Sequence, residues 1–95
     1  MNEQEAVRLE VELRNRDGLH ARPVSRIVEI ANRFAADFTI IKEETEVDGR
    51  SVLQLLTLAA PKGTRLILVA IGEDADKLVA SIRDEIDRGF GEPID

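Results

Sequence analysis

The residues with the clearest chemical potential lie in one short segment, Gly18-Leu19-His20-Ala21-Arg22-Pro23. His20 is the only histidine of the chain, and imidazole is a nucleophile whose charge changes near neutral pH. The hydrophobic pattern predicts a helix directly after it, and the first turn of a helix leaves backbone N–H groups unpaired and carries partial positive charge. This setting suits a histidine nitrogen that accepts a phosphoryl group, with backbone amides and Arg22 binding the phosphoryl oxygens.

Each part of this segment also has an ordinary structural explanation. Asp17-Gly18 is a common turn sequence, and Pro23 suits a first helical turn because no intrahelical donor is lost there. A lone histidine at a helix start is often a cap or a solvated residue, and Arg22 has the alternative of being a solvated surface arginine. On spacing alone, the structural and the chemical interpretations both stay open.

Two blocks of sequence resemble a known family. Residues 18–23 look like the active-site signature of the histidine-containing phosphocarrier protein, HPr, of the phosphoenolpyruvate-dependent phosphotransferase system. Residues 51–58 and the turn Pro61-Lys62-Gly63-Thr64 resemble the serine-led second helix of that family and the turn after it. The spacing between the blocks also fits, and the resemblance extends from Glu5 to about Phe90.

Other segments are similar to one branch of the family or depart from its pattern. The run Leu55 to Ala60 and the tail Gly89-Phe90-Gly91-Glu92 resemble the nitrogen-related branch, NPr. Ala59 stands where glycine is common, and the hairpin Glu43-Glu44-Thr45-Glu46 is unusually acidic. These departures bear on which partners the chain meets.

The resemblance implies a role for His20 and Arg22. His20 would accept a phosphoryl group on Nδ1 from enzyme I and pass it to a downstream EIIA-type protein. Arg22 would donate its planar guanidinium to the phosphoryl oxygens. No base, metal-ligand set or glycine-rich phosphate loop accompanies His20, so the expectation is a covalent carrier between partner enzymes, without a cofactor, and not an enzyme itself.

The second block suggests further sites, each with a structural alternative. Ser51 is a good N-cap for a short helix, and it matches a serine that a dedicated kinase, with a counteracting phosphorylase, modifies in some HPr proteins. Leu53 and Leu56 match positions of the family's partner-binding patch. Leu56 is also a candidate core residue, whereas Leu53 would point outward.

Composition narrows the possible functions. The 95 residues predict a single domain over residues 1–95, with its core at about 5–90. The chain has no cysteine and one histidine, which argues against disulfides and metal sites. Three phenylalanines and a net charge of −6 disfavour nucleic acid and anionic membranes as partners. The polar N-terminus and the lack of a long apolar run predict a cytoplasmic protein, and a monomer is expected.

Hydrophobic periodicity predicts seven elements in the order β-α-β-β-α-β-α. The first strand alternates apolar with charged residues, which indicates a sheet covered on one side only. The predicted strands span 7–13, 37–42, 45–47 and 65–71, and the predicted helices span 21–35, 51–59 and 75–86. Val52, Leu55, Leu56 and Ala59 are expected on the inner face of the second helix. The predicted fold class is α+β: an open-faced sandwich of a four-stranded antiparallel sheet with three helices on one face.

Two other functions compete with the carrier. Sheets with helices on one face serve many purposes, so a small regulatory or ligand-binding α+β module is the main alternative. An interaction domain that uses the charged sheet face is another. Only the carrier requires covalent phosphorylation of His20, and that requirement separates the three functions.

Overall fold

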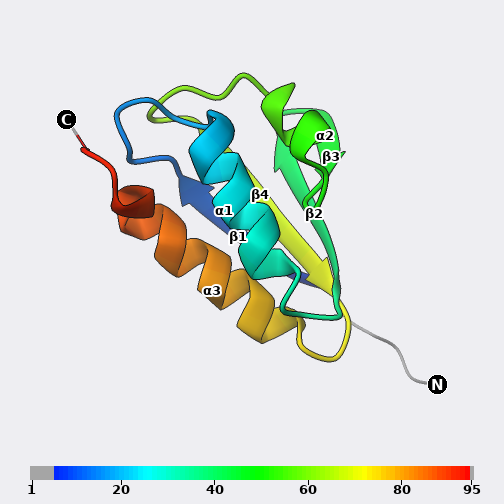
Figure 1. The fold of residues 1–95 in the computed structure, drawn as a ribbon. Helices are drawn as coiled ribbons and strands as arrows, with labels where there is room; N and C mark the ends of the chain where they lie inside the picture. The colour runs from blue at the N-terminus through cyan, green and yellow to red at the C-terminus, as the bar shows by residue number, and fades with distance from the viewer. Residues whose placement is uncertain (1–5, 95) are drawn as a thin grey trace.

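The computed structural model describes residues 6–94 as a four-stranded sheet with its helices packed on one face (Figure 1). The elements are β1 (Ala6–Glu12), α1 (Ala21–Ala31), β2 (Asp37–Lys42), β3 (Thr45–Asp48), α2 (Val52–Leu56), β4 (Arg65–Ile71), α3 (Ala75–Asp87) and the short turn η1 (Gly89–Gly91). The predicted α+β open-faced sandwich and its element order are confirmed. None of the helices within residues 6–94 is long and apolar enough to cross a membrane.

The sheet has the strand order β1-β4-β2-β3, and every neighbouring pair is antiparallel. The nearly continuous apolar sequence of β4 fits its central place, where Leu66, Leu68 and Ala70 are fully buried beneath the helices. On the edge strand β1, the alternate residues Arg8 and Glu10 are exposed on the open face. The period-two pattern of the sequence therefore places the core between the sheet and the helical layer.

The first helix ends earlier than its periodicity predicts. It stops at Ala31, and the prediction that it continues to residue 35 is wrong. The Arg50 guanidinium donates to the carbonyls of Ala31 and Phe34, each at 2.8 Å. The Asp74 carboxylate accepts hydrogen bonds from the amides of residues 35 and 36, each at 2.9 Å. Because two distant side chains satisfy the backbone groups here, the chain can leave the helix without losing those bonds.

The second helix is only five residues long, and it presents more apolar surface than predicted. Leu55 is fully buried, but Val52 and Leu56 are 39% and 38% exposed, and Ala59 is exposed as well. The expectation that all four face inward is wrong. Leu55 is the buried residue of this five-residue helix, and because α2 ends at Leu56 the helical period does not carry on to Ala59. Leu58, just beyond the helix, is buried instead.

Ala59 adopts a left-handed backbone with φ of +50°. A β-carbon makes this conformation unfavourable by roughly 1–2 kcal/mol, whereas glycine adopts it freely. We expect Ala59→Gly to raise the free energy of unfolding by about 0.5–1 kcal/mol, since glycine's greater unfolded-state entropy offsets part of the gain. Chemical denaturation measures the change, with Ala80→Gly inside α3 as the matched control, which should lose about 1 kcal/mol. Equal losses in both variants would show that no strain is relieved at Ala59.

Candidate functional site

The loop before α1 is held against the segment that follows α2. The Leu19 amide donates to the Ala60 carbonyl at 2.8 Å, and the Gly18 amide donates to the Asn15 carbonyl at 3.1 Å. Gly18 has φ of +65°, and a Cβ built on it would lie 2.3 Å from the Ala60 carbonyl oxygen. Glycine is therefore required at this position, and the close approach that it permits brings His20 next to the chain leaving α2.

His20 occupies the N-cap position of α1, but its side chain does not cap the helix. Its backbone is extended, and its carbonyl accepts a hydrogen bond from the Val24 amide at 3.1 Å. Pro23 is buried in the first turn, where proline costs no hydrogen bond. The imidazole is 42% exposed. The ring is thus accessible to a partner, and capping is not its role.

The C-terminal segment turns back onto this loop after α3. Gly89, Phe90 and Gly91 have φ values of +64°, +56° and +75°, and this left-handed turn ends α3 and directs the chain toward the loop before α1. Phe90 is 9% exposed and packs into the core, while the Arg16 amide donates to the Pro93 carbonyl at 2.8 Å. These contacts place the side chain between them, that of Glu92, beside the histidine.

Glu92 joins His20 to a buried asparagine. The Glu92 carboxylate is 8% exposed, and its Oε1 lies 3.1 Å from His20 Nε2. Asn15 is fully buried, and its Nδ2 donates to the same Oε1 at 3.0 Å and to the Gly18 carbonyl at 2.8 Å. The imidazole, the carboxylate and the amide therefore form one connected network at the start of α1.

Two opposing effects act on the Glu92 carboxyl group. Burial works to raise its pKa, but hydrogen bonds from His20 and Asn15 and the nearby charges of His20 and Arg22 outweigh it, so that the pKa is lowered from its ordinary value of 4.5. The group is therefore ionised at neutral pH. A lowered carboxyl pKa contributes stability that is present above the ordinary value and is lost as the pH falls through the lowered one.

Arg22 stands at the open side of this network. Its side chain is 78% exposed, and its Nη1 lies 3.9 Å from Glu92 Oε2, at the long end of ion-pair distances. So exposed and distant a pair holds the guanidinium only weakly. The structure therefore brings the two predicted residues, His20 and Arg22, to the same carboxylate and leaves the arginine able to move toward an anion.

The sequence interpretation missed Asn15 and Glu92. Glu92 lies 72 residues beyond His20, in a tail that had drawn attention only by its resemblance to one family branch. Asn15 precedes the turn and looks like an ordinary loop residue in sequence. The available signal was compositional: two small residues flank Phe90, a pattern that favours a sharp reversal of the chain just before an acidic side chain.

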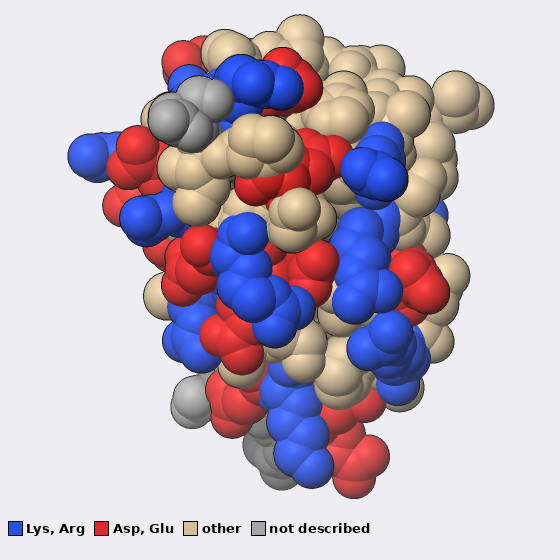
Figure 2. Space-filling model, turned by 60° about the vertical axis from the view of Figure 1, so that its left-hand side comes forward, with Lys and Arg blue, Asp and Glu red and all other residues tan. Residues whose placement is uncertain are grey.

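The second helix supplies an exposed apolar surface near the histidine loop. Leu53 is 77% exposed, and with Val52 and Leu56 it forms what we call the α2 patch. The Ser51 hydroxyl caps this helix by accepting a hydrogen bond from the Gln54 amide at 3.2 Å. Figure 2 shows basic and acidic side chains intermixed over the side on which α3 comes forward, with a larger uncharged area at the upper right. A group of exposed apolar side chains such as the α2 patch is typical of a docking surface.

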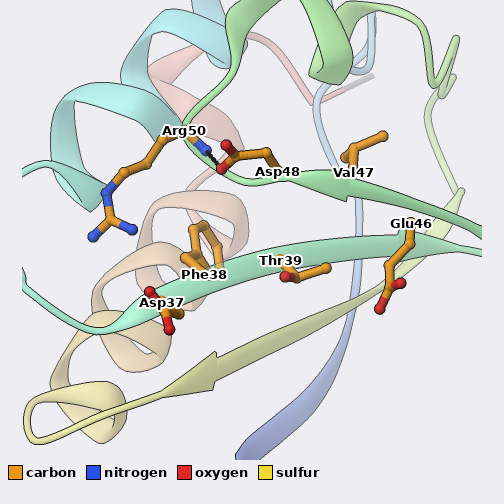
Figure 3. A pocket seen from close by; sticks show the side chains of 7 residues that line it. All are labelled: Asp37, Phe38, Thr39, Glu46, Val47, Asp48 and Arg50. Atoms are coloured by element: carbon orange, nitrogen blue, oxygen red, sulfur yellow. Dashed lines mark hydrogen bonds between the residues drawn. The ribbon is translucent and has the colours of Figure 1, made fainter.

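A hollow of about 500 Å³ on β2 and β3 does not belong to this network (Figure 3). Asp37, Glu46 and Asp48 line it, together with Thr39 and Arg50, whose backbone amide donates to Asp48 Oδ1 at 2.9 Å. The Arg50 guanidinium is committed to carbonyls at the end of α1. Within residues 6–94, no three acidic, histidine or cysteine side chains are grouped closely enough to hold a metal ion. The hollow therefore offers no counterpart to the chemistry available at His20.

Comparisons with known proteins agree with this geometry. The family model described as the PTS HPr component phosphorylation site matches residues 7–88. The HPr-like protein Crh of Bacillus subtilis is 38% identical over 84 residues, which cover 84% of this chain and 99% of Crh. Phosphocarrier protein HPr of Neisseria meningitidis is 34% identical over 82 residues, which cover 86% of this chain and 92% of that protein. The structure of HPr-C-His from Thermoanaerobacter tengcongensis matches with a TM-score of 0.87 at 29% identity, covering 90% and 97% of the two chains.

Fold and comparisons together define the class of protein. An open-faced sandwich that presents one accessible histidine at the start of its first helix has the architecture of a small phosphocarrier. The chain belongs to the HPr family of the phosphotransferase system.

Proposed function

We propose that this protein accepts a phosphoryl group on His20 from enzyme I and passes it to an EIIA-type protein. The observation that carries the proposal is the placement of the chain's only histidine, 42% exposed and free of capping, at the N-terminus of α1. The partial positive charge of the helix start and the neighbouring Arg22 suit a group of oxygens bearing negative charge. The cytoplasm is the compartment that we propose for this exchange.

A two-step transfer experiment tests this function. The protein is incubated with phosphoenolpyruvate and enzyme I, and its intact mass should rise by one phosphoryl group. After phosphoenolpyruvate and enzyme I are removed, addition of an excess of an EIIA-type protein should return the mass to its starting value. A protein that stays unmodified would favour the regulatory or ligand-binding alternative, because neither of those needs covalent phosphorylation.

Arg22 should affect the transfer rate and not the fold. We expect Arg22→Ala to slow phosphorylation by enzyme I about tenfold, because the guanidinium supplies charge-assisted hydrogen bonds to the phosphoryl oxygens. Since the side chain is 78% exposed, the free energy of unfolding should change by no more than about 0.5 kcal/mol. Arg22→Lys should recover only part of the rate, because an ammonium lacks the planar fork. Rapid-quench kinetics measure these rates. A wild-type rate in Arg22→Ala would show that backbone amides alone bind the phosphoryl oxygens.

The α2 patch is the surface on which we propose that partners dock. Leu53 projects furthest, and Leu56 lies beside it with about a third of its surface exposed. Burial of these side chains against a partner would remove apolar area from water, which favours association. The alternative that Leu56 is a core residue has less support, because Leu56 is 38% exposed and Leu55 is the fully buried residue of this helix.

Ser51 has a structural role that the structure shows and a regulatory role that we propose. Ser51→Ala should lose about 1 kcal/mol of stability, because the hydrogen bond to the Gln54 amide is removed. Ser51→Asp should keep the stability, because aspartate also caps helices, but it should slow phosphorylation of His20 by placing charge at the docking surface. Thermal unfolding and enzyme I kinetics of both variants measure the two effects. Wild-type kinetics in Ser51→Asp would reduce Ser51 to a cap and leave no role for a serine kinase or phosphorylase.

We propose that the protein acts as a monomer. In residues 6–94, β1 pairs with β4 of the same chain through seven consecutive residue pairs. A structure of Crh from Bacillus subtilis, with a TM-score of 0.71, is described as a swapped dimer, so the point is testable by light scattering. The nitrogen-related branch stays a prediction that is supported by the sequence of the C-terminal tail.

A further inference from the structure

Asn15 is fully buried, and the side chain of Glu92 is 8% exposed; neither residue belongs to the phosphoryl-accepting segment. Glu92 also lies outside residues 7–88, the part of the chain that the family model matches. We propose that Glu92 and Asn15 are positioning residues that hold the His20 ring in the tautomer with hydrogen on Nε2, which leaves the Nδ1 lone pair for phosphorus. The proposal rests on the proposed function of His20, but the state of the ring can be measured without any phosphoryl transfer.

The hydrogen bond between the ring and the carboxylate has a defined direction. Nε2 of His20 lies 3.1 Å from Oε1 of Glu92. An ionised carboxylate only accepts hydrogen bonds, so the ring nitrogen must donate. The lowered pKa of Glu92 keeps the carboxyl group ionised at neutral pH. In the neutral ring, a hydrogen on Nε2 leaves the lone pair on Nδ1.

Asn15 holds the Glu92 carboxylate in place. Its Oε1 accepts from Asn15 Nδ2, and the other hydrogen of that amide goes to the Gly18 carbonyl. Asn15 is fully buried, so with both hydrogens in use its amide has one orientation. Asn15 Oδ1 is buried without a hydrogen-bond partner among residues 6–94, an arrangement that costs about 1–3 kcal/mol. The amide therefore serves its two acceptors at the expense of its own oxygen, and it ties the carboxylate to the turn that precedes His20.

The position of Glu92 has a consequence for phosphoryl transfer to His20. The Nδ1 lone pair forms a bond to phosphorus while the bond between phosphorus and the donor group breaks, and the electron pair of that bond stays with the donor. Nε2 keeps its hydrogen, so the ring gains positive charge as the new bond forms. The Glu92 carboxylate already lies at Nε2 and stabilises that charge without having to reorganise. The other oxygen of the carboxylate, Oε2, lies 3.9 Å from Arg22 Nη1. Because this contact is long, it leaves the arginine free to bind the phosphoryl oxygens.

Glu92→Gln and Glu92→Ala test the proposal, with Glu73→Gln as the control at an exposed glutamate in the turn between β4 and α3. The first variant keeps a hydrogen-bond acceptor but removes the charge, and the second removes both. We expect the maximal rate of phosphorylation by enzyme I to fall about ten- to hundredfold in both, with an unchanged half-saturating concentration of carrier. The ¹H–¹⁵N spectra of the unphosphorylated wild type at alkaline pH should show only the Nε2-protonated ring, and Glu92→Ala should populate the other tautomer.

Distinct results would overturn the proposal. A Glu92→Ala ring that stays entirely Nε2-protonated would show that the carboxylate does not select the tautomer. A raised half-saturating concentration with an unchanged maximal rate would make Glu92 a docking residue. If the wild type accepts no phosphoryl group, the proposed function fails, and the spectra still decide whether Glu92 positions the ring.

Discussion

His20→Ala should fold normally and accept no phosphoryl group from enzyme I. The chain has no second histidine, so no other imidazole can take its place. The loss should reach the detection limit, at least about a thousandfold, because removing a nucleophile leaves no alternative route for a covalent intermediate. Intact-mass measurement after incubation with phosphoenolpyruvate and enzyme I gives the result.

The fold should tolerate this change because the imidazole contributes little to packing. Its ring is 42% exposed and does not cap α1, and among residues 6–94 its one polar contact is with Glu92. Circular dichroism and thermal unfolding check that the variant is folded. An alanine variant that is still phosphorylated at the wild-type rate would contradict His20 as the acceptor.

Gly18→Ala should be the most destabilising single-methyl change near the site. A Cβ there would lie 2.3 Å from the Ala60 carbonyl oxygen and 2.8 Å from Pro61 Cα, and both neighbours are backbone atoms that cannot turn aside. The φ of +65° adds the cost of a left-handed alanine. We expect a loss of about 3–4 kcal/mol in the free energy of unfolding, because backbone must shift in a closely packed region.

Gly63→Ala is the matched control for that clash. Gly63 has φ of +89°, but a Cβ on it would meet no atom within 4 Å. Gly63→Ala should lower the free energy of unfolding by about 1–2 kcal/mol, which is the cost of a left-handed alanine alone. Urea denaturation of Gly18→Ala and Gly63→Ala therefore separates the steric clash from this backbone cost. Equal losses would mean that the loop before His20 moves away from the segment after α2 without resistance.

The order of the elements was accessible from sequence because it depends on local periodicity. Alternation along β1 and the three- and four-residue spacing in α1 and α3 are signals within one element, and each element occurs in the predicted order, although α1 ends before its predicted end. The apolar run of β4 likewise fits its place between β1 and β2.

The boundaries were harder to predict because distant side chains set them. The end of α1 depends on Arg50 and Asp74, which are far along the chain and satisfy its last carbonyls and the amides beyond them. The exposed side of α2 depends on where the chain turns at Ala59. No periodic pattern within the helices carries that information.

The residues of the candidate site also differ in how well the sequence predicts them. His20 and Arg22 are two residues apart in a recognisable segment, so local sequence was sufficient to predict them. Glu92 reaches the ring only because a glycine-flanked left-handed turn ends α3 and directs the chain toward His20. Asn15 is informative only once its two acceptors are known. Contacts that close across most of the chain length are set by the fold and have no short-range signal.

The most direct test is to locate the phosphoryl group on the 95-residue chain. The protein is phosphorylated with phosphoenolpyruvate and enzyme I, and ³¹P and ¹⁵N spectra identify the bonded atom. We expect one phosphoramidate on Nδ1 of His20, labile in acid and stable in alkali, which disappears when an excess of an EIIA-type protein is added after phosphoenolpyruvate and enzyme I are removed. No phosphorylation, or an acid-stable ester on a serine such as Ser51 in place of the phosphohistidine, would contradict it.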